Sequence, residues 1–439
     1  MSDHSRARYA LAVLFAINAM NFFDRQIAGA LAEPIRKQWN LSDGALGALG
    51  TAFTLLYAFV GIPLGRLSDR TSRKRILSVA VLAWSALTSL SSVTRSYWQM
   101  FAARLGVGVG EAACAPAATS MIGDLYPPAR RARALSIFML GLPIGIALSY
   151  LVSSFVAHTY GWRAAFFVAG IPGVICAIAA MFIHEPARGM AETRPSVPPP
   201  TSAASGATPT WRIVLTIPTM WWLILSGALH NFNMYALGSF LSAFLMRYHA
   251  VNLRQAGLIA MSVYGLSGVP GLLIGGALAD SMMKRRKDGR LLVGMVAILI
   301  SIPMLLLALR RPAHDVVGFA LLASVGCMAM YVYYSSVYAT IHDVIAPSLR
   351  GTAMALYFFA MYVLGASLGP LVTGMLSDHF TRQAAGGAKS LEPFRGQGLH
   401  SAMYLIPVLS VLLAAVLFFA SRTVAADMEK RDRHGAPSS

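Results

Sequence analysis

The segment Gly65-Arg66-Leu67-Ser68-Asp69-Arg70, followed by Arg73-Lys74-Arg75, ends one apolar stretch of the chain, and a similar segment ends another. The second copy reads Gly276-Ala277-Leu278-Ala279-Asp280 and is followed by Lys284-Arg285-Arg286. Its glycine and its aspartate each lie 211 residues after those of the first copy. A motif repeated at one register indicates two halves that arose by duplication, an organisation found in many secondary transporters.

The composition is that of a membrane protein. Of the 439 residues, 56% are hydrophobic and 12% are charged, and the mean hydropathy is +0.60, whereas soluble domains carry about 25% charged residues. About 20 apolar residues cross a bilayer as a helix. The sequence therefore predicts an all-α membrane protein with twelve transmembrane helices in two pseudo-symmetric six-helix bundles. The predicted spans are 9–31, 44–65, 76–95, 98–120, 132–156, 164–184, 214–245, 254–279, 291–309, 315–341, 351–376 and 400–420.

The net charge of +18 raises the question of a nucleic-acid partner, and the positions of the basic residues answer it. Loops and tails on one side of the predicted membrane hold 23 of the 36 lysines and arginines, against 11 on the other side. Such an excess marks the cytoplasmic side, so both termini are expected in the cytoplasm. The basic tail Arg422–Arg433 is expected to be solvated near lipid headgroups. The bilayer, and no nucleic acid, is the expected partner.

A segment without hydrophobic periodicity, Glu185–Pro209, lies between spans six and seven and is rich in proline, serine and alanine. This composition predicts a flexible linker. The predicted division is an N-terminal bundle over 1–185, a cytoplasmic linker over 186–210, and a C-terminal bundle with a short basic tail over 211–439. A second repeat supports it, because Asp124 recurs 219 residues later as Asp343, each with a proline and an arginine behind it.

The repeated hinge is a candidate cytoplasmic gate. Gly65 lets a neighbouring backbone approach, while Asp69 can face a helix N-terminus and pair with Arg73 one turn later. The alternative interpretation is that these charges only determine how the chain is oriented in the membrane. Asp124 is expected to share the basic partners of the first hinge. Asp280, Lys284 and Asp343 are expected to form the matching cluster in the second half. The candidate gate residues are Gly65, Asp69, Arg70, Arg73, Asp124, Arg133, Asp280, Lys284 and Asp343.

The first hinge resembles the signature of the major facilitator superfamily, a Gly-x-Leu-x-Asp-Arg pattern followed by basic residues, although Ser72 stands where that family usually has a second glycine. Three further segments, Asn21–Arg25, Arg104–Ala112 and Arg133–Phe138, resemble the spinster-type branch. The resemblance covers all the predicted spans. It implies the major facilitator fold and, for the spinster-type branch, proton-linked movement of lysophospholipids and sphingosine-like lipids.

Two charged residues interrupt the first predicted span. A charge at the centre of a span costs about 2.5 to 3.5 kcal/mol on insertion scales, and Asp24 and Arg25 project about 100° apart on a helix, so they cannot fully neutralise each other. Glu111 in span four is the expected partner of Arg25, and Arg104 lies close to the same face. The charges either form a static ion pair that joins spans one and four, or Asp24 or Glu111 takes up a proton and releases the arginine.

The second half has no acid at the corresponding place, and span seven instead carries His230, Asn231 and Asn233. They are candidates for proton relay or substrate binding, although a neighbour can also satisfy such groups. Spans ten and eleven hold an aromatic cluster whose inward members, with Tyr334 and Tyr357 as candidates, suit an amphiphile. Interfacial belts and core packing are the alternative. The cluster comprises Tyr331, Tyr333, Tyr334, Tyr338, Tyr357, Phe358, Phe359 and Tyr362.

No motif for catalysis, cofactors or metals is evident. The glycines at 106, 108 and 110 lie inside an apolar span and follow no strand, so they indicate helix packing rather than a nucleotide loop. Cys114, Cys176 and Cys327 lie in apolar spans, so neither a disulfide framework nor a metal cluster is indicated. The sequence contains no HExxH, nucleophile elbow or P-loop. We expect no enzyme and no cofactor, with protons as the coupling ion.

These observations predict a proton-coupled secondary transporter that moves a small amphiphilic substrate by alternating access. A symporter of small organic anions, with Arg25 binding a carboxylate, and a drug/proton antiporter are alternatives on the same fold. An uncoupled lipid scramblase is a further alternative, but it has no need of Asp24. The expected state is a monomer in a bacterial inner membrane.

Overall fold

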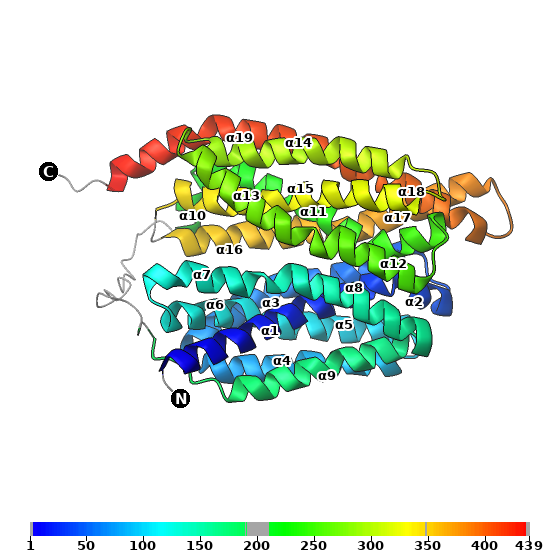
Figure 1. Ribbon diagram of the computed structural model, residues 1–439, viewed down its shortest axis with the longest axis horizontal. Helices are drawn as coiled ribbons and strands as arrows, with labels where there is room; N and C mark the ends of the chain where they lie inside the picture. Colours follow the sequence, from blue (N-terminus) through cyan, green and yellow to red (C-terminus); the bar gives the residue numbers. More distant parts are fainter. Residues whose placement is uncertain (1–2, 189, 191–209, 347–348, 436–439) are drawn as a thin grey trace. The chain divides into compact units, whose positions relative to one another are not determined.

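The computed structural model describes residues 3–188, 190, 210–346 and 349–435, and the regular elements in these ranges are helical (Figure 1). The first half contains α1 (Asp3–Ala30), α2 (Ala32–Trp39), α3 (Asp43–Arg70), α4 (Arg73–Leu90), α5 (Tyr97–Glu111), α6 (Cys114–Leu125), α7 (Pro128–Met139), α8 (Gly141–Tyr160) and α9 (Trp162–Met181). The second half contains α10 (Thr210–Leu215), α11 (Pro218–Tyr248), α12 (Leu253–Ala260), α13 (Gly268–Met283), α14 (Gly289–Leu309), α15 (Val316–Val344), α16 (Arg350–Ala360), α17 (Leu368–Ala385), α18 (Arg395–Met403) and α19 (Leu405–Gly435).

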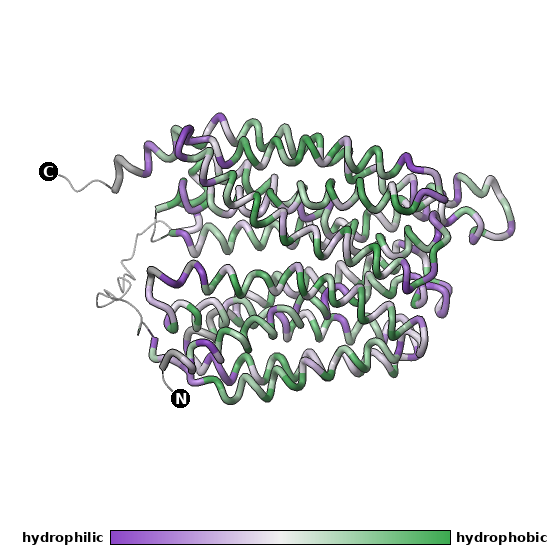
Figure 2. Tube along the Cα trace, in the orientation of Figure 1, coloured by the Kyte–Doolittle hydropathy of each residue, from purple (hydrophilic) through white to green (hydrophobic). Residues whose placement is uncertain are grey.

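The membrane-spanning character of the chain is clear from its helices. Among the described residues, ten helical segments are long and apolar enough to cross a bilayer. Hydrophobic residues fill the middle of these helices and hydrophilic residues gather at their ends (Figure 2). Two further long helices, α1 and α11, are not apolar and uncharged enough to be counted among these ten. They are the helices that begin the two predicted bundles. With these two, the twelve-helix arrangement is complete.

Several predicted spans are interrupted. Span four is divided into α5 and α6 at Ala112–Ala113, and span five into α7 and α8 at Leu140. Spans eight and eleven each contain a π-helical segment, Met261–Leu266 and Met361–Ala366. Such local changes of helical pitch alter the direction in which the following side chains point, and they are common at functional sites. Hydrophobic periodicity alone does not reveal them, because the apolar pattern continues across each break.

The chain forms two compact units. Unit 1 comprises Met1–Leu41, Ala52–Ala204 and Asn252–Met261, and unit 2 comprises Ser42–Thr51, Ser205–Val251 and Ser262–Ser439. Two short segments are therefore exchanged relative to the predicted halves: the start of α3 packs with unit 2, and α12 packs with unit 1. The predicted linker falls almost entirely outside the described residues, so its limits stay a prediction.

Small residues bring the helices of each unit together. In unit 1, a Cβ atom on Gly145 would lie 2.1 Å from the carbonyl oxygen of Ala19, so α8 crosses α1 at backbone contact. In unit 2, a Cβ atom on Gly369 would lie 2.4 Å from the carbonyl oxygen of Phe232, where α17 crosses α11. Close backbone approach of this kind replaces the hydrophobic effect as a packing force in lipid. It fixes α1 and α11, which carry the candidate site residues.

Candidate functional site

The structure brings together the charged side chains that the sequence places in spans one and four. Arg25 on α1 donates from Nη2 to Glu111 Oε2 on α5 over 3.4 Å, and to the amide oxygen of Asn21 over 3.1 Å. The side chains of Arg25 and Glu111 are 6% and 0% exposed. Arg104 is buried on the same helix as Glu111. Unit 1 therefore encloses an ionic site within its membrane-spanning helices.

Aromatic rings from the second span surround the arginines. The guanidinium carbon of Arg25 lies 4.5 Å from the ring centroid of Tyr57 and 5.4 Å from that of Phe53. Arg104 lies 5.0 Å above the same Phe53 ring. Rings at these distances attract cations through their quadrupole, more strongly where water is excluded. Sequence reasoning missed Phe53 and Tyr57, although their spacing of four residues places them on one face of α3.

Asp24 does not share the partner of Arg25. It is fully buried, and neither carboxyl oxygen has a hydrogen-bond partner in the described part of the chain. The nearest polar groups include the indole of Trp84 and the hydroxyl of Thr88, both on α4, close enough to interact with the carboxyl electrostatically. Neither reaches hydrogen-bond geometry, and both are themselves buried without a partner among the described residues. Sequence reasoning also missed Trp84 and Thr88, because a tryptophan and a threonine in an apolar span look like ordinary packing.

In unit 2, the polar side chains of α11 meet the aromatic cluster. The imidazole of His230 stacks on Tyr333 with 4.0 Å between ring centroids and meets Tyr334 edge-on at 4.7 Å. Both ring nitrogens of His230 lack a hydrogen-bond partner within the described residues. The hydroxyl of Tyr334 donates to the amide oxygen of Asn231 over 3.1 Å. Asn233 instead donates to Ser410 on α19 over 3.1 Å, which ties it to packing within the unit.

The tyrosines divide into a sealed group and a more open group. Tyr333 lies between Ser226 and Tyr357, with oxygen to oxygen distances of 2.7 and 3.1 Å, and both tyrosines of this chain are fully buried. Tyr334, Tyr338 and Tyr362 are half-buried. Tyr357 therefore belongs to a satisfied internal hydrogen-bond chain, whereas Tyr334 keeps part of its surface free for contact with another group.

At the predicted cytoplasmic end of unit 1, one arginine joins two carboxylates. Arg73 pairs with Asp124 on α6. It also pairs, over 3.2 Å, with Glu185, which follows α9 in the chain. Burial by itself raises the pKa of Glu185, but hydrogen bonds from the Ser72 hydroxyl and from Arg73 outweigh burial and hold this pKa below its usual value. The pairing of Arg73 with Asp124 was expected, and Glu185 is an addition. Arg70 and Arg133 are exposed, and the surroundings of Gly65 and of the Asp69 side chain lie outside what the structure describes.

The corresponding cluster in unit 2 contains a different basic residue from the expected one. Asp280 and Asp343 do come together, but the cation between them is Arg290, which lies 2.9 Å from Asp280 and also pairs with Asp343. The expectation that Lys284 fills this place is therefore wrong. Lys284 follows directly on the last turn of α13, whereas Arg290 returns towards Asp280 from the first turn of α14 after the intervening loop.

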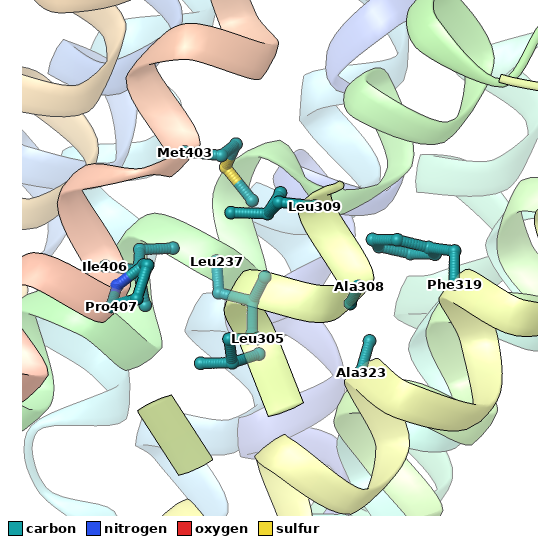
Figure 3. A pocket seen from close by; sticks show the side chains of 9 residues that line it. All are labelled: Leu237, Leu305, Ala308, Leu309, Phe319, Ala323, Met403, Ile406 and Pro407. Atoms are coloured by element: carbon teal, nitrogen blue, oxygen red, sulfur yellow. The ribbon is translucent and has the colours of Figure 1, made fainter. Parts of the chain in front are cut away.

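A small void in unit 2 does not belong to either site. It measures about 20 Å³ and is lined by nine side chains without polar atoms, from α11, α14, α15, α18 and α19 (Figure 3). This is room for about one water molecule, yet the walls offer no polar partners for one. Within the described residues no group of three potential metal ligands is found.

Three comparisons place the chain among known proteins. The model of the Major Facilitator Superfamily matches residues 14–370. An MFS-type efflux pump of Mycolicibacterium smegmatis is 30% identical over 417 residues, which cover 94% of this chain and 92% of the pump. The sphingosine-1-phosphate transporter SPNS2 of Danio rerio is 27% identical over 435 residues, covering 93% and 84% of the two chains.

Among solved structures, a bacterial homolog of the human lysosomal transporter Spinster, in an inward-facing and unoccupied conformation, is similar with a TM-score of 0.84. It is 28% identical, and the match covers 96% of this chain and 98% of that one. Because the family model, the curated relatives and the solved structure agree along nearly the whole chain, this protein is a spinster-like member of the major facilitator superfamily, and thus a membrane transporter rather than an enzyme.

Proposed function

We propose that this protein is a proton-coupled secondary transporter that moves an amphiphile, with an apolar body and a polar head, by alternating access. The observation that carries the coupling is the buried charge set of unit 1, in which Asp24 has no hydrogen bond within the described residues. An unpaired ionised carboxylate away from water is far more costly than a neutral carboxylic acid. We therefore expect Asp24 to be a carboxyl that exchanges a proton during transport.

The same site provides a way for a proton to change the structure. Arg25 is paired with Glu111 over 3.4 Å. When Glu111 accepts a proton, the charge that holds Arg25 is lost, and the guanidinium can bind an anionic head group or another carboxylate. The aromatic rings of Phe53 and Tyr57 keep it in place while it changes partners. A static ion pair predicts no such exchange.

Unit 2 supplies the surface suited to the cargo. His230 is buried beside Tyr333 and Tyr334, and within the described residues its two ring nitrogens have no hydrogen-bond partner. Tyr334 and Tyr338 are half-buried. Aromatic rings with polar tips bind apolar chains and orient polar heads. The similarity to a sphingosine-1-phosphate transporter supports a lysolipid-like or sphingosine-like cargo.

A drug/proton antiporter is the second candidate, favoured by the similarity to an efflux pump over 94% of this chain. Symport of small organic anions is a third use of the same residues, with Arg25 holding a carboxylate. We further propose a monomer in a bacterial inner membrane with both termini in the cytoplasm, which the distribution of the basic residues supports.

Proteoliposomes test the coupling. Uptake of a fluorescent lysophospholipid is measured with and without an imposed pH gradient for the wild type, Asp24→Asn and Glu111→Gln. The matched controls are Glu429→Gln, on an exposed carboxylate, and Asp315→Asn, on a half-buried one, both outside the site and both changed by the same chemistry. We expect the gradient to drive uptake in the wild type and controls only. Uptake that ignores the gradient and survives both site variants would contradict proton coupling.

The cargo is identified separately. A ligand that binds only the folded protein raises its melting temperature by mass action, about 2.7 kcal/mol at a concentration 100 times Kd. Lysophospholipids, sphingosine-1-phosphate, organic acids and cationic drugs are compared in a thermal-shift assay on the wild type and on the site variant His230→Ala. We expect the amphiphiles to give the largest shift and His230→Ala to reduce it. A shift confined to small acids would favour the anion symporter.

A further inference from the structure

Asp24 and Arg25 are neighbours in the sequence, but they face different parts of unit 1. Arg25 points towards α5 and towards the aromatic rings of α3. The carboxyl of Asp24 instead lies near Trp84 and Thr88 on α4 and near the thiol of Cys176 on α9, close enough to interact with all three electrostatically. The surroundings of Asp24 are therefore formed to a large part by α4 and α9.

Several buried polar atoms gather at this point without a hydrogen-bond partner among the described residues. They are both carboxyl oxygens of Asp24, the indole nitrogen of Trp84, and the hydroxyls of Ser85 and Thr88. All four side chains are fully buried. A buried polar group without a partner is costly, and native proteins satisfy nearly all such groups with protein atoms or with water. A cluster of them beside one turn of α4 indicates a place that binds water molecules.

The polar face of α4 continues from this cluster to the end of the helix. One turn after Thr88 comes Ser92, in the short 3₁₀ helix that follows α4, and then Thr94, and both are buried. Thr94 lies about 10 Å beyond Thr88 along the chain axis. Its carbonyl oxygen accepts a hydrogen bond of 2.8 Å from Arg163, a half-buried residue at the start of α9. Buried polar groups therefore connect Asp24 with the end of unit 1 opposite to the repeated hinge.

The backbone of α9 lies directly against this polar face. A Cβ atom on Gly173 would overlap the hydroxyl of Ser85, and one on Gly170 would overlap the hydroxyl of Ser89. The two glycines therefore leave room for hydroxyl groups between the helices. We call the surface formed by these four residues together with Thr88 and Ser92 the α4–α9 seam, and it lies wholly within unit 1.

We propose that the coupling proton reaches Asp24 along the α4–α9 seam, from the end of unit 1 opposite to the hinge, through water molecules bound to the hydroxyls. The inference rests on the proposed function, in which Asp24 exchanges a proton. A hydronium ion at the surface gives up the proton, and a carboxylate oxygen of Asp24 gains it. A serine or threonine hydroxyl both donates and accepts hydrogen bonds, so it can take part in such a chain, whereas the indole of Trp84 only donates and holds a water oxygen in place.

The charges around Asp24 connect this route to the ion pair of Arg25. Arg104 and Glu111 interact with the Asp24 carboxyl from α5, and the thiol of Cys176 does so from α9. An arginine stabilises the ionised form of a nearby carboxyl, and a second carboxylate stabilises the protonated form. Because Glu111 also pairs with Arg25, a change in that pair alters the charge that faces Asp24. The seam delivers the proton to one face of α1, and the ion pair responds on the other.

Removing a single hydroxyl tests the route. Thr88→Val keeps the shape of the side chain but has no hydroxyl, and Thr88→Ser keeps the hydroxyl. In proteoliposomes we expect Thr88→Val to slow gradient-driven uptake of a fluorescent lysophospholipid roughly tenfold or more, while exchange of labelled for unlabelled lipid continues. Thr88→Ser should restore driven uptake. The matched control is Thr119→Val, because the Thr119 hydroxyl bonds to a carbonyl of its own helix, α6, and it should behave like the wild type.

A second measurement needs no cargo. The fluorescence of Trp84, defined by subtracting the signal of Trp84→Phe, is followed by stopped flow in sealed vesicles of one orientation after the pH is changed on one side only. We expect acidification at the Thr94 end to change this signal in the wild type, and to do so roughly tenfold more slowly in Thr88→Val. A signal that follows only the pH at the hinge end would overturn the proposal.

The outcomes separate the route from the proposed function. Gradient-driven uptake that survives Asp24→Asn would contradict proton coupling itself. If Asp24→Asn abolishes driven uptake while Thr88→Val keeps the wild-type rate in both assays, coupling stands and the route is wrong. Loss of exchange together with driven uptake would show that the hydroxyl only supports the fold. Ser85→Ala removes a second hydroxyl of the seam and gives the same comparison if Thr88→Val does not fold.

Discussion

The first helix of each bundle, α1 in unit 1 and α11 in unit 2, is polar in its middle, but the two are polar in different ways. α1 carries Asp24 and Arg25 and meets a carboxylate on α5. α11 carries His230 and Asn231 and meets tyrosines of α15. One site is built from charges and the other from neutral hydrogen-bonding and aromatic groups. The duplicated scaffold therefore carries two chemistries, which is the basis of our proposal that unit 1 couples protons and unit 2 recognises the cargo.

The largest expected effect comes from removing the acids of unit 1. Asp24→Asn or Glu111→Gln should reduce gradient-driven accumulation to the level of empty liposomes, because neither amide can release a proton. Exchange of labelled for unlabelled cargo should continue, since unit 2 is intact. Counterflow and gradient-driven uptake are measured side by side. Loss of both activities together would mean that the two sites are not separable.

Removing the polar contacts of unit 2 should weaken binding and spare coupling. His230→Ala or Tyr334→Phe should raise KM roughly tenfold, the effect of losing about 1.4 kcal/mol of binding energy. The dependence of uptake on the pH gradient should not change. Tyr404→Phe, which alters a tyrosine outside the aromatic cluster, is the control. A change in coupling with an unchanged KM would reverse the assignment.

Trp84 offers an optical test of the state of Asp24. Its indole lies beside the Asp24 carboxyl, so a proton gained or lost there should alter its fluorescence. A pH-dependent component of the intrinsic fluorescence is expected in the wild type, and it should vanish in Trp84→Phe and in Asp24→Asn. Trp98→Phe, which removes an indole that is 71% exposed, is the control and should keep it. A pH response that survives Asp24→Asn would assign the titration to another group.

The smallest effect concerns the cytoplasmic clusters, where unit 1 has the extra carboxylate Glu185. The pKa of Glu185 in the folded protein lies below the usual value of 4.5. The ionised carboxylate therefore stabilises the fold above pH 4.5, and this stabilisation is lost as the pH falls through the folded-state pKa. Glu185→Gln should therefore lower stability by about 1 kcal/mol at pH 7, and the loss should fade below pH 4.5. Melting temperatures are compared across this range with Asp280→Asn as the reference. A loss independent of pH would mean that shape, not charge, matters at this position.

The fold and the partners of the ionic site were largely predictable. A charged pair in an apolar span demands a partner, and Glu111 was the available one. The surroundings of that pair were not predictable, because Phe53 and Trp84 are common residues of apolar spans and become informative only when the helices are packed. Arg290 replaced Lys284 because a loop returned it to Asp280, and loop paths leave no periodic signal. The assignment of Ser42–Thr51 to unit 2 was also not predictable, because it depends on contacts between residues that lie hundreds of positions apart in the sequence.

At the start of α3, the backbone N–H groups of Asp43 and Gly44 donate to the carboxylate of Asp378 on α17. This contact affects how the chain matures during synthesis. Ribosomes extend a chain by about 5 to 20 residues per second, so the 334 residues between Gly44 and Asp378 take roughly 17 to 70 s to add. During that interval the N–H groups of Asp43 and Gly44 lack Asp378, and until Arg247 is made, 204 residues after Asp43, the Asp43 carboxylate lacks its arginine as well. The N-terminal bundle can therefore insert early, but the contacts at the start of its second span form only after Asp378 has been made.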